Sequence, residues 1–378
     1  MFAHLAARPR ARGKRPHPVR SQPNEPELTT HSAPTTDKIF RIAINGYGRI
    51  GRCYLRALHE AGLADRFRIV AINEPADLAS ITYLTRFDST HGRYPGAVGS
   101  ADGCLLVNGQ PIAVTHASTP EGVAWADAGI DLVVECSGQY GSRDQLERFL
   151  EAGCPRLLLS HPGNSAEDVD ATVVFGVNHM QLNGAERLVS NASCTTNAVV
   201  PVLDLLQREV GLEQVLLTTL HSAMNDQPLI DGYHHTDLRR TRSAMQSIIP
   251  VSTGLARGVE RLLPALSGRV VAKAIRVPTH NVSAIDIVLT LERDLRPGEL
   301  NALLRDAAGG CYRGLIACSD DAHASIDFNH DPHSAIVDAS QTRGIGPRMI
   351  NLMVWFDNEW GFASRMVDVT RHWLDGTR

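Results

Sequence analysis

One cysteine lies in a segment whose residue types favour nucleophilic chemistry. Cys194 is bracketed by small hydrogen-bonding residues over 190–197, and an apolar segment follows over 198–206. Polar residues before an apolar run are typical of a helix start. The free N–H groups and the positive dipole end of a helix favour a thiolate there, and they could also hold an oxyanion or a phosphate. Cys194 is therefore a candidate nucleophile, with a buried structural cysteine as the alternative.

His221, at the end of a predicted strand over residues 213–220, is the candidate base for this thiol. An imidazole beside Cys194 could orient and deprotonate it, and the resulting ion pair would be reactive at neutral pH. A histidine at a strand end is by itself more often structural. Its combination with a cysteine at a helix start favours a catalytic pair.

Two groups of arginines are candidate ligands for an anion. They are a basic cluster over residues 237–242 and Arg276, which follows a predicted strand over 270–275. The planar guanidinium group matches the oxygens of a phosphate, and residues 252–254 offer hydroxyl and backbone donors for the same anion. For the basic cluster, a solvent-exposed charge run or a salt-bridged subunit contact is the alternative.

Two histidine pairs resemble metal ligands only superficially. His234 and His235 are adjacent and diverge, and Pro332 breaks any helical face shared by His330 and His333. Because a structural metal site needs several converging ligands, the sequence predicts no metal.

The first half contains a glycine-rich turn in a setting typical of dinucleotide binding. A predicted strand over residues 38–45 leads into Gly46, Gly48 and Gly51. The glycines permit a tight turn and a close approach of a pyrophosphate to the next helix. Glu74 ends the following strand, where a carboxylate would bind the adenosine ribose 2′-OH of NAD and repel the 2′-phosphate of NADP. A glycine-rich turn without a ligand is the alternative.

The order of predicted elements indicates an α/β protein. Strands alternate with helices in the first half, which predicts a parallel, doubly wound, Rossmann-type domain. Long strands with intervening helices predict an α+β second domain with a mixed, largely antiparallel sheet. Ligands of open α/β sheets bind at carboxyl ends of strands, so Ser137 is expected on the nicotinamide side, with an ordinary turn as the alternative. The expected strands are 38–45, 68–74, 131–136, 156–160, 171–177, 213–220, 270–276, 283–292 and 349–356, and the expected helices are 53–63, 142–152, 202–209, 253–263, 297–308 and 359–374.

Composition excludes several classes of protein. The 378 residues suggest two domains, and 43% hydrophobic with 21% charged residues is ordinary for a globular chain. The net charge of -4 gives no general attraction to nucleic acid or to a membrane. No apolar run approaches the roughly 18 residues that would span a bilayer. Seven cysteines without a Cys-x-x-Cys pair favour a reducing compartment, and a cytoplasmic protein is expected.

Residues 1–37 differ in composition from the remainder. Six basic residues precede the first acidic residue, Glu25, and several prolines accompany them. Such a segment cannot bury enough apolar surface to fold, so a disordered basic leader is expected. A non-functional extension, from a start codon assigned too early, is preferred to an organelle transit peptide because the prolines interrupt an amphipathic helix.

Four segments resemble the glyceraldehyde-3-phosphate dehydrogenase superfamily, namely residues 45–52, 190–197, 276–279 and 357–361. The resemblance runs from about Arg41 to the end of the chain. It implies that Cys194 is the nucleophile and His221 its base. It also implies NAD contacts at Arg49, Ile50 and Asn358, and substrate contacts at Ser193, Thr195, Arg240, Thr253, Gly254 and Arg276.

Within this superfamily, residues 221–227, 238–242 and 327–338 are similar to the erythrose-4-phosphate dehydrogenase branch. In the glycolytic branch, two threonines that help to bind phosphate stand where Met224 and Asp226 stand here. Methionine cannot replace their hydrogen bonds and aspartate repels an anion. The resemblance therefore implies NAD-dependent oxidation of D-erythrose 4-phosphate to 4-phosphoerythronate, through a cysteine thioester that water hydrolyses, on the route to pyridoxal 5′-phosphate.

Two alternatives to this function stay open. One is the phosphorylating glyceraldehyde-3-phosphate dehydrogenase of glycolysis. The other is a non-enzymatic redox-sensing or RNA-binding protein, for which an intact pair of Cys194 and His221 would have little purpose.

The resemblance also implies how the chain is divided and assembled. We expect an NAD-binding domain over residues 38–193, completed by a returning helix over 357–378, and a catalytic domain over 194–356. A homotetramer is expected, with the loop over residues 233–247 between subunits near the cofactor. The expected partners are the sugar-phosphate aldehyde and other copies of the chain, not nucleic acid or a membrane.

Overall fold

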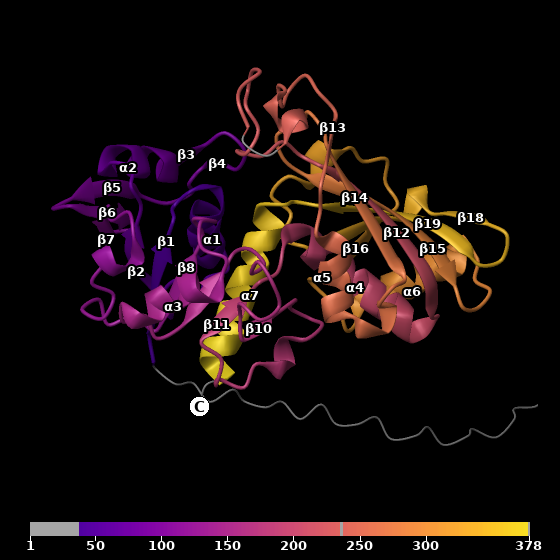
Figure 1. The fold of residues 1–378 in the computed structure, drawn as a ribbon, viewed down its shortest axis with the longest axis horizontal. Coiled ribbons are helices and arrows are strands. Elements are labelled where there is room, and N and C mark those ends of the chain that lie inside the picture. The colour runs from indigo at the N-terminus through magenta and orange to yellow at the C-terminus, as the bar shows by residue number, and fades with distance from the viewer. Residues whose placement is uncertain (1–37, 235–236, 377–378) are drawn as a thin grey trace, which may run out of the picture. The chain divides into compact units, whose positions relative to one another are not determined.

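Two large sheets, one from each half of the chain, organise the structure (Figure 1). The computed structural model describes residues 38–234 and 237–376, so the predicted leader and His235 lie outside the described residues. The first sheet has nine strands, and the second has eight. The α/β class expected from the sequence is confirmed.

The first sheet is parallel around its central strand β1 (Phe40–Asn45). This strand pairs with β2 (Phe67–Asn73) on one side and with β8 (Leu132–Glu135) on the other, both in parallel. The strand order therefore reverses at β1, and ligands bind at such a switch point in open α/β sheets. The spatial order is β10 (Ala171–Thr172), β11 (Leu188–Ser190), β9 (Leu157–Leu159), β8, β1, β2, β7 (Gln110–Thr115), β6 (Cys104–Val107) and β5 (Val98–Ala101).

Three helices of the first half join these strands: α1 (Arg49–Glu60), α2 (Leu78–Arg86) and α3 (Arg143–Glu151). The prediction that the first of them begins at residue 53 is wrong. The helix begins directly after the glycine turn, and Gly51 is buried in its first turn, where a Cβ would lie 2.4 Å from the carbonyl oxygen of Gly46. The predicted pattern treated residues 46–51 as a turn, whereas Gly51 lies inside the helix.

The second sheet is mixed and largely antiparallel, as expected. Its central strands are β12 (Leu212–His221), β15 (Ser283–Leu291) and β19 (Met349–Phe356), which pair antiparallel. Only the pairs β12 with β14 and β16 with β17 are parallel among its described strands. The other strands are β13 (Ile249–Val251), β14 (Val270–Arg276), β16 (Ile316–Ser319), β17 (Ala335–Asp338) and β18 (Arg343–Ile345).

Helices cover one face of the second sheet and enclose its core (Figure 1). They are α4 (Cys194–Glu209), α5 (Leu255–Leu262) and α6 (Pro297–Gly309). Alternate residues of β15, from Ile285 to Leu291, face this core. The period of two in the burial of the strand is the pattern of a sheet with one covered face.

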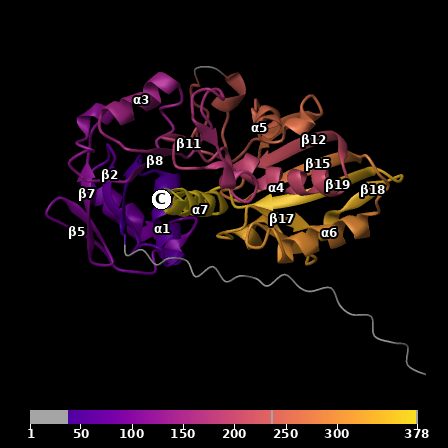
Figure 2. The ribbon, with the colours of Figure 1, turned by 90° about the horizontal axis from the view of Figure 1, so that it is seen from below.

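The last helix, α7 (Trp360–Gly376), returns from the second sheet to α1 (Figure 2). Its buried residues Met366 and Trp373 belong to the same core as Tyr54 and Leu58 of α1. Tyr54 and Thr370 join the two helices through their hydroxyls, 3.0 Å apart. The first hydrophobic core is therefore built from residues near both ends of the described chain.

Short elements complete the fold. The strand expected over residues 171–177 is confirmed only at β10, because the chain turns after Thr172. In the described part of the chain, no helix is long and apolar enough to cross a membrane. The remaining elements are β3 (Phe87–Asp88), β4 (Gly92–Arg93), η1 (Pro120–Gly122), η2 (His179–Gln181), η3 (Leu238–Thr241), η4 (Pro264–Leu266), η5 (Ser325–Phe328) and η6 (Ala339–Gln341).

The glycine turn generates a stability prediction. Gly46 has a φ of 84°, and a Cβ there would lie 2.4 Å from the amide nitrogen of Ser137. Gly46→Ala should lower the free energy of unfolding by at least about 2 kcal/mol, because it adds backbone strain to a steric clash. Gly48→Ala is the matched control, since its φ is -72° and no atom lies within 4 Å of the added carbon.

Chemical denaturation without cofactor measures both variants. The control should lose less than about 1 kcal/mol. An equal loss in the two variants would show that the approach of Gly46 to Ser137 does not matter.

Candidate active site

Cys194 is the first residue of α4, as the polar bracket predicts. Ser193 is the N-cap, and its hydroxyl accepts a hydrogen bond of 3.1 Å from the amide of Thr196. Ala192, just before it, has a φ of 56°, a backbone conformation that residues other than glycine rarely adopt. The strained turn and the cap together fix the direction in which the thiol points.

His221 lies against this thiol at the end of β12. Its Nε2 is 3.5 Å from Cys194 Sγ, and the imidazole is only 6% exposed. His221 Nδ1 is 2.9 Å from the carbonyl oxygen of Ser222. When Nδ1–H donates to that oxygen, the lone pair of Nε2 faces the sulfur, which is the tautomer that a general base needs.

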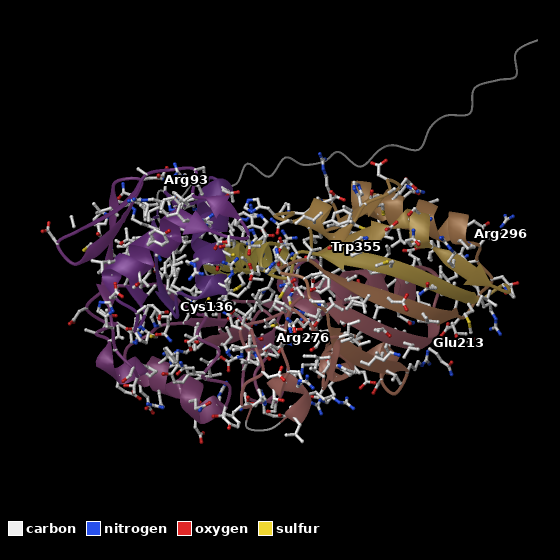
Figure 3. The ribbon with its side chains drawn as sticks, turned by 90° about the horizontal axis from the view of Figure 1, so that it is seen from above. Arg93, Cys136, Glu213, Arg276, Arg296 and Trp355 are labelled. Atoms are coloured by element: carbon white, nitrogen blue, oxygen red, sulfur yellow. The ribbon has the colours of Figure 1, made fainter. Side chains whose placement is uncertain are left out.

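Arg276 reaches the same imidazole because β12 and β14 are parallel and in register. His221 pairs with Arg276 across these strands, and Arg276 Nη1 lies 3.0 Å from His221 Nδ1. The same nitrogen donates to the Ser222 carbonyl oxygen over 3.3 Å. Figure 3 labels this arginine, the last residue of β14. The parallel pair thus brings a base and a cation, 55 positions apart in sequence, to one strand end.

Asp226 holds the two arginines that are candidates for a phosphate ligand. Its Oδ2 is 3.0 Å from Arg240 Nη1 and 3.8 Å from Arg276 Nη2. The sequence predicts the two arginines as an anion site, and the structure brings them together around one carboxylate. The positive charge that these two arginines offer to an incoming anion is therefore partly neutralised by Asp226.

Thr253 and Gly254 stand at the start of α5. Gly254 is its N-cap residue, and the Thr253 hydroxyl accepts a 3.1 Å hydrogen bond from the amide of Leu255. This helix lies against the first turn of α4, where a Cβ on Gly258 would be 3.2 Å from the hydroxyl of Thr196. The structure therefore places the two predicted substrate residues on a neighbour of the nucleophile helix.

A cavity at the switch point of the first sheet contains the predicted dinucleotide residues. Glu74 follows β2, and its carboxylate accepts hydrogen bonds from the amides of Tyr47, at 2.7 Å, and Ala76, at 3.3 Å. The N-terminus of α1 is left without a side-chain cap by the described residues, so its N–H groups can bind an anion. The cavity is lined by Asn45, Gly46, Gly48, Asn73, Glu74, Pro75, Ala117, Ser118, Cys136, Ser137, Gln139 and Tyr140.

Ser137 lines this cavity but its hydroxyl is already engaged. Both its amide, at 2.7 Å, and its hydroxyl donate to Oε1 of Glu135. Ser137 lies in the same cavity as Glu74 and Pro75, so its placement toward the nicotinamide stays a prediction. Figure 3 labels its neighbour Cys136, the residue that follows β8.

Arg49 and Asn358 are held in different ways. The guanidinium of Arg49 is bound by Asp88 and Glu359. Its backbone N–H, at the start of α1, is therefore the group with which it could donate to a ligand. The Oδ1 of Asn358 accepts hydrogen bonds from the hydroxyls of Ser222, at 2.9 Å, and Ser283, at 2.8 Å. Asn358 Nδ2 has no partner among the described residues, so it is able to donate to a carboxamide oxygen of a ligand.

Two protein-family models match the chain. Residues 40–143 match the glyceraldehyde 3-phosphate dehydrogenase, NAD binding domain, and residues 193–358 match the glyceraldehyde 3-phosphate dehydrogenase, C-terminal domain. Together the matches cover more than two thirds of the sequence. The chain belongs to the glyceraldehyde-3-phosphate dehydrogenase family. It is an NAD-dependent oxidoreductase, and NAD is its cofactor. The cavity beside Gly46 and Glu74 offers a carboxylate and uncapped helix N–H groups, which are the groups that a dinucleotide needs.

Burial acts against the ion pair that the sequence predicts for this dehydrogenase. Burial raises the pKa of the Cys194 thiol to about 11, although Arg276 and the first amides of α4 act in the opposite direction. Burial and the charge of Arg276 lower the pKa of His221 to about 4. Both shifts favour the neutral forms of the two groups. Burial therefore acts against the helix dipole at Cys194, and the ion pair stays a prediction.

A neutral pair still permits general-base chemistry. The thiol proton can move to Nε2 as sulfur attacks an electrophile, so charge develops only during the reaction. Arg276 favours the thiolate and opposes the imidazolium, since it is positively charged. It therefore sets the balance between the two forms of the pair.

The sequence did not reveal a network of hydrogen-bonded polar side chains that borders the cavity beside Gly46. Glu135 Oε2 accepts a 2.5 Å hydrogen bond from Asn45, whose Oδ1 accepts one of 2.8 Å from Asn73. Asn73 Oδ1 then accepts from Thr115 and Ala117, both at 2.9 Å. Each of these residues ends one of the neighbouring strands or follows it. A polar residue at the end of each of several apolar strands is the sequence pattern that could have predicted the network.

The prediction of no metal concerns two histidine pairs, of which His235 lies outside the described residues. His333 pairs with Asp331, with Nδ1 and Oδ1 2.7 Å apart. In the described ranges, one group of three ligating side chains has donor atoms within 4.8 Å of one another, namely Cys53, His91 and Glu359. Arg49 already binds the carboxylate of that group, so a cation is not needed to balance its charge.

The geometry around Arg276 generates a prediction about the thiol. Arg276→Gln should raise the pKa of Cys194, because the variant removes the nearest positive charge. At about pH 8 the rate of alkylation by iodoacetamide should fall roughly three- to tenfold. A neutral reagent is used so that binding of a phosphate plays no part.

Arg240→Gln is the matched control, since that arginine contacts Asp226 and not the catalytic pair. Cys194→Ser gives the background from the other cysteines. Equal rates in the wild type and the Arg276 variant would remove Arg276 as a regulator of the thiol.

Proposed function

We propose that this dehydrogenase oxidises D-erythrose 4-phosphate to 4-phosphoerythronate and that water releases the product. Cys194 Sγ attacks the aldehyde carbon, and the thiol proton ends on the new hydroxyl by way of His221 Nε2. His221 then takes the hydroxyl proton as the hydride leaves the same carbon, which gives a thioester on Cys194. NAD, when bound, accepts that hydride. Water finally attacks the thioester carbon and the carbon–sulfur bond breaks. The proton held by His221 returns to sulfur, and both protons of the water are released to solvent as the carboxylate departs.

The arrangement of Asp226 supports water over inorganic phosphate as the acceptor. Inorganic phosphate needs donors and positive charge, yet Asp226 lies 3.0 Å from Arg240 and 3.8 Å from Arg276. Met224, two positions earlier, has no hydroxyl to donate. A dianion placed beside this carboxylate is repelled, whereas a neutral water molecule is not. This carboxylate between two arginines is the observation on which the proposal rests.

The remaining roles follow the same proposal. Glu74 binds the adenosine ribose, the amides of Arg49 and Ile50 bind the pyrophosphate, and Asn358 donates to the carboxamide of NAD. Support comes from the contacts of Glu74 with Tyr47 and from the unpartnered Nδ2 of Asn358. The substrate is assigned to Ser193 and Thr195, which flank it, and to Arg240, Thr253, Gly254 and Arg276, which hold its phosphate or its hydroxyls.

We also propose the division of the chain and its assembly. Residues 38–193 with the last helix form the NAD-binding domain, residues 194–356 form the catalytic domain, and four copies associate in the cytoplasm. The tetramer is supported by apolar side chains that the segment around residues 229–248 exposes. They are Leu229, Ile230, Tyr233, Leu238 and Ile248.

Phosphorylating oxidation of D-glyceraldehyde 3-phosphate is the second candidate. The family match favours it as much as the proposed reaction, because the match does not distinguish the two aldehydes. The two candidates differ in the fate of the thioester, which is hydrolysed by water in one and cleaved by inorganic phosphate in the other.

Product analysis separates them. With D-erythrose 4-phosphate, NADH should form at the same rate with and without inorganic phosphate, and the product should be a carboxylate. The same assay with D-glyceraldehyde 3-phosphate compares the two aldehydes, and Cys194→Ser should show no turnover. Strict dependence on inorganic phosphate, with an acyl phosphate as product, would reject the proposal.

A double variant tests the role of Asp226 directly. Met224→Thr with Asp226→Thr restores two hydroxyl donors and removes the carboxylate, so inorganic phosphate should compete with water. Acyl phosphate should rise at least about tenfold as a share of product, which corresponds to about 1.4 kcal/mol. Asn225→Thr, between the two positions and exposed, is the matched control. No acyl phosphate from the double variant would mean that another residue excludes the anion.

A further inference from the structure

Two histidines from distant parts of the chain meet through their Nδ1 atoms. His91 lies between β3 and β4, and His330 follows η5. Their Nδ1 atoms are 3.1 Å apart. Each outer nitrogen contacts a carboxylate, His91 Nε2 at 3.0 Å from Glu359 and His330 Nε2 at 3.0 Å from Glu60.

All three contacts can be hydrogen bonds only if the pair carries three ring protons. An ionised carboxylate only accepts hydrogen bonds, so each Nε2 must carry a proton. A contact of 3.1 Å between two Nδ1 atoms needs one proton between them, because two lone pairs would repel. Three protons on four ring nitrogens make the pair a single shared imidazolium, whereas two neutral histidines would carry two.

The surroundings of the pair favour this positive charge. The ring of His330 stacks on the indole of Trp360, with centroids 3.7 Å apart and planes 23° from parallel. The face of an indole attracts a cation. Burial opposes ionisation of Glu359, but Arg49 and His91 outweigh it and hold its pKa below the usual value. The carboxylate that faces His91 is therefore ionised.

The backbone of His330 is held in an uncommon conformation. Its φ is 69°, which is uncommon for a residue with a Cβ and carries a conformational cost. The amide of His330 donates a 2.7 Å hydrogen bond to Asp357, which also accepts from the amides of Glu359 and Trp360 at the start of α7. One aspartate thus holds both the strained histidine and the helix start.

The pair is connected to both ends of the proposed cofactor site. Glu359, which accepts from His91, follows Asn358 directly and also binds Arg49, the first residue of α1. Arg49 in turn binds Asp88, and Asp88 accepts a 2.9 Å hydrogen bond from the amide of His91, which closes a ring. A change in the charge of the pair therefore alters contacts that reach the start of α1 and the residue next to Asn358.

We propose that His91 and His330 share one proton and act as positioning residues for NAD, so that NAD binds more weakly once the proton is lost. Loss of the proton leaves two Nδ1 lone pairs facing each other, and the contact must open. Glu359 then loses its partner, and Arg49 and Asn358 lose a fixed neighbour. The proposal concerns the cofactor and holds whichever aldehyde is the substrate.

Charged and titratable groups from several elements surround the pair. They are Arg49, Cys53 and Glu60 of α1, Asp88 of β3, and Asp357 and Glu359 before α7. Glu60 and Glu359 contact the imidazoles, and their negative charges favour the protonated pair. Arg49 neutralises Glu359 and therefore disfavours protonation of the pair. A metal ion between the two Nδ1 atoms would satisfy the same geometry, and the experiment separates it from a proton.

Calorimetric titration of the full-length protein with NAD between about pH 6 and about pH 9 is the test. The dissociation constant of the wild type should rise roughly five- to tenfold across one protonation step. Binding should take up a fraction of a proton across that step, because the form with higher affinity carries the proton. His330→Asn, chosen because asparagine tolerates a positive φ, should bind NAD with the weaker affinity at all pH values and show no step.

Glu60→Gln and Arg66→Gln are the companion variants. Glu60→Gln keeps an acceptor but removes the negative charge, so the step should move to lower pH. Arg66→Gln breaks the contact with Asp375 at the far end of α7 and should keep the wild-type profile. The proposal is overturned if His330→Asn retains the step, if Glu60→Gln leaves it in place, or if a chelator removes it from the wild type.

Discussion

Only three residues separate the last strand of the parallel sheet from the helix that carries the thiol. β11 ends at Ser190 and α4 begins at Cys194, so the chain passes from one sheet to the cover of the other within one turn. Cys194 consequently packs against both hydrophobic cores. A nucleophile in this position is at the carboxyl edge of the dinucleotide sheet without any loop to place it there. The rest of the site is arranged around this short connection.

Partners reach Cys194 by the pairing of strands in the second sheet. Parallel pairing of β12 and β14 sets His221 opposite Arg276, and antiparallel pairing of β15 with β19 brings Ser283 opposite Phe356, next to the turn with Asn358. Ser222 then contacts His221 through its carbonyl oxygen and Asn358 through its hydroxyl. The predicted base and the predicted cofactor amide therefore share one rigid support, in which sheet hydrogen bonds hold the backbone.

Signals local in sequence account for what could be predicted. The helix start at Cys194, the strand end at His221 and the glycine turn at Gly46 each depend on neighbours along the chain. Contacts over long separations could not be predicted in this way. Asp226 between two arginines and His91 against His330 depend on the final pairing of strands and loops. The pKa shifts of Cys194 and His221 could not be predicted for a similar reason, because burial is a property of the fold and not of the segment.

The return of α7 to α1 has a consequence for biosynthesis. Trp360, Met366, Trp373 and Leu374 fill the same core as the first strand and the first helix. On the ribosome, the nascent first sheet therefore exposes apolar surface until the codons for this helix have been translated. The second sheet is completed only shortly before, because its central strand β19 ends at Phe356 and α7 begins at Trp360. Such a delay exposes the unfinished half to aggregation and makes it a natural client for chaperones during synthesis.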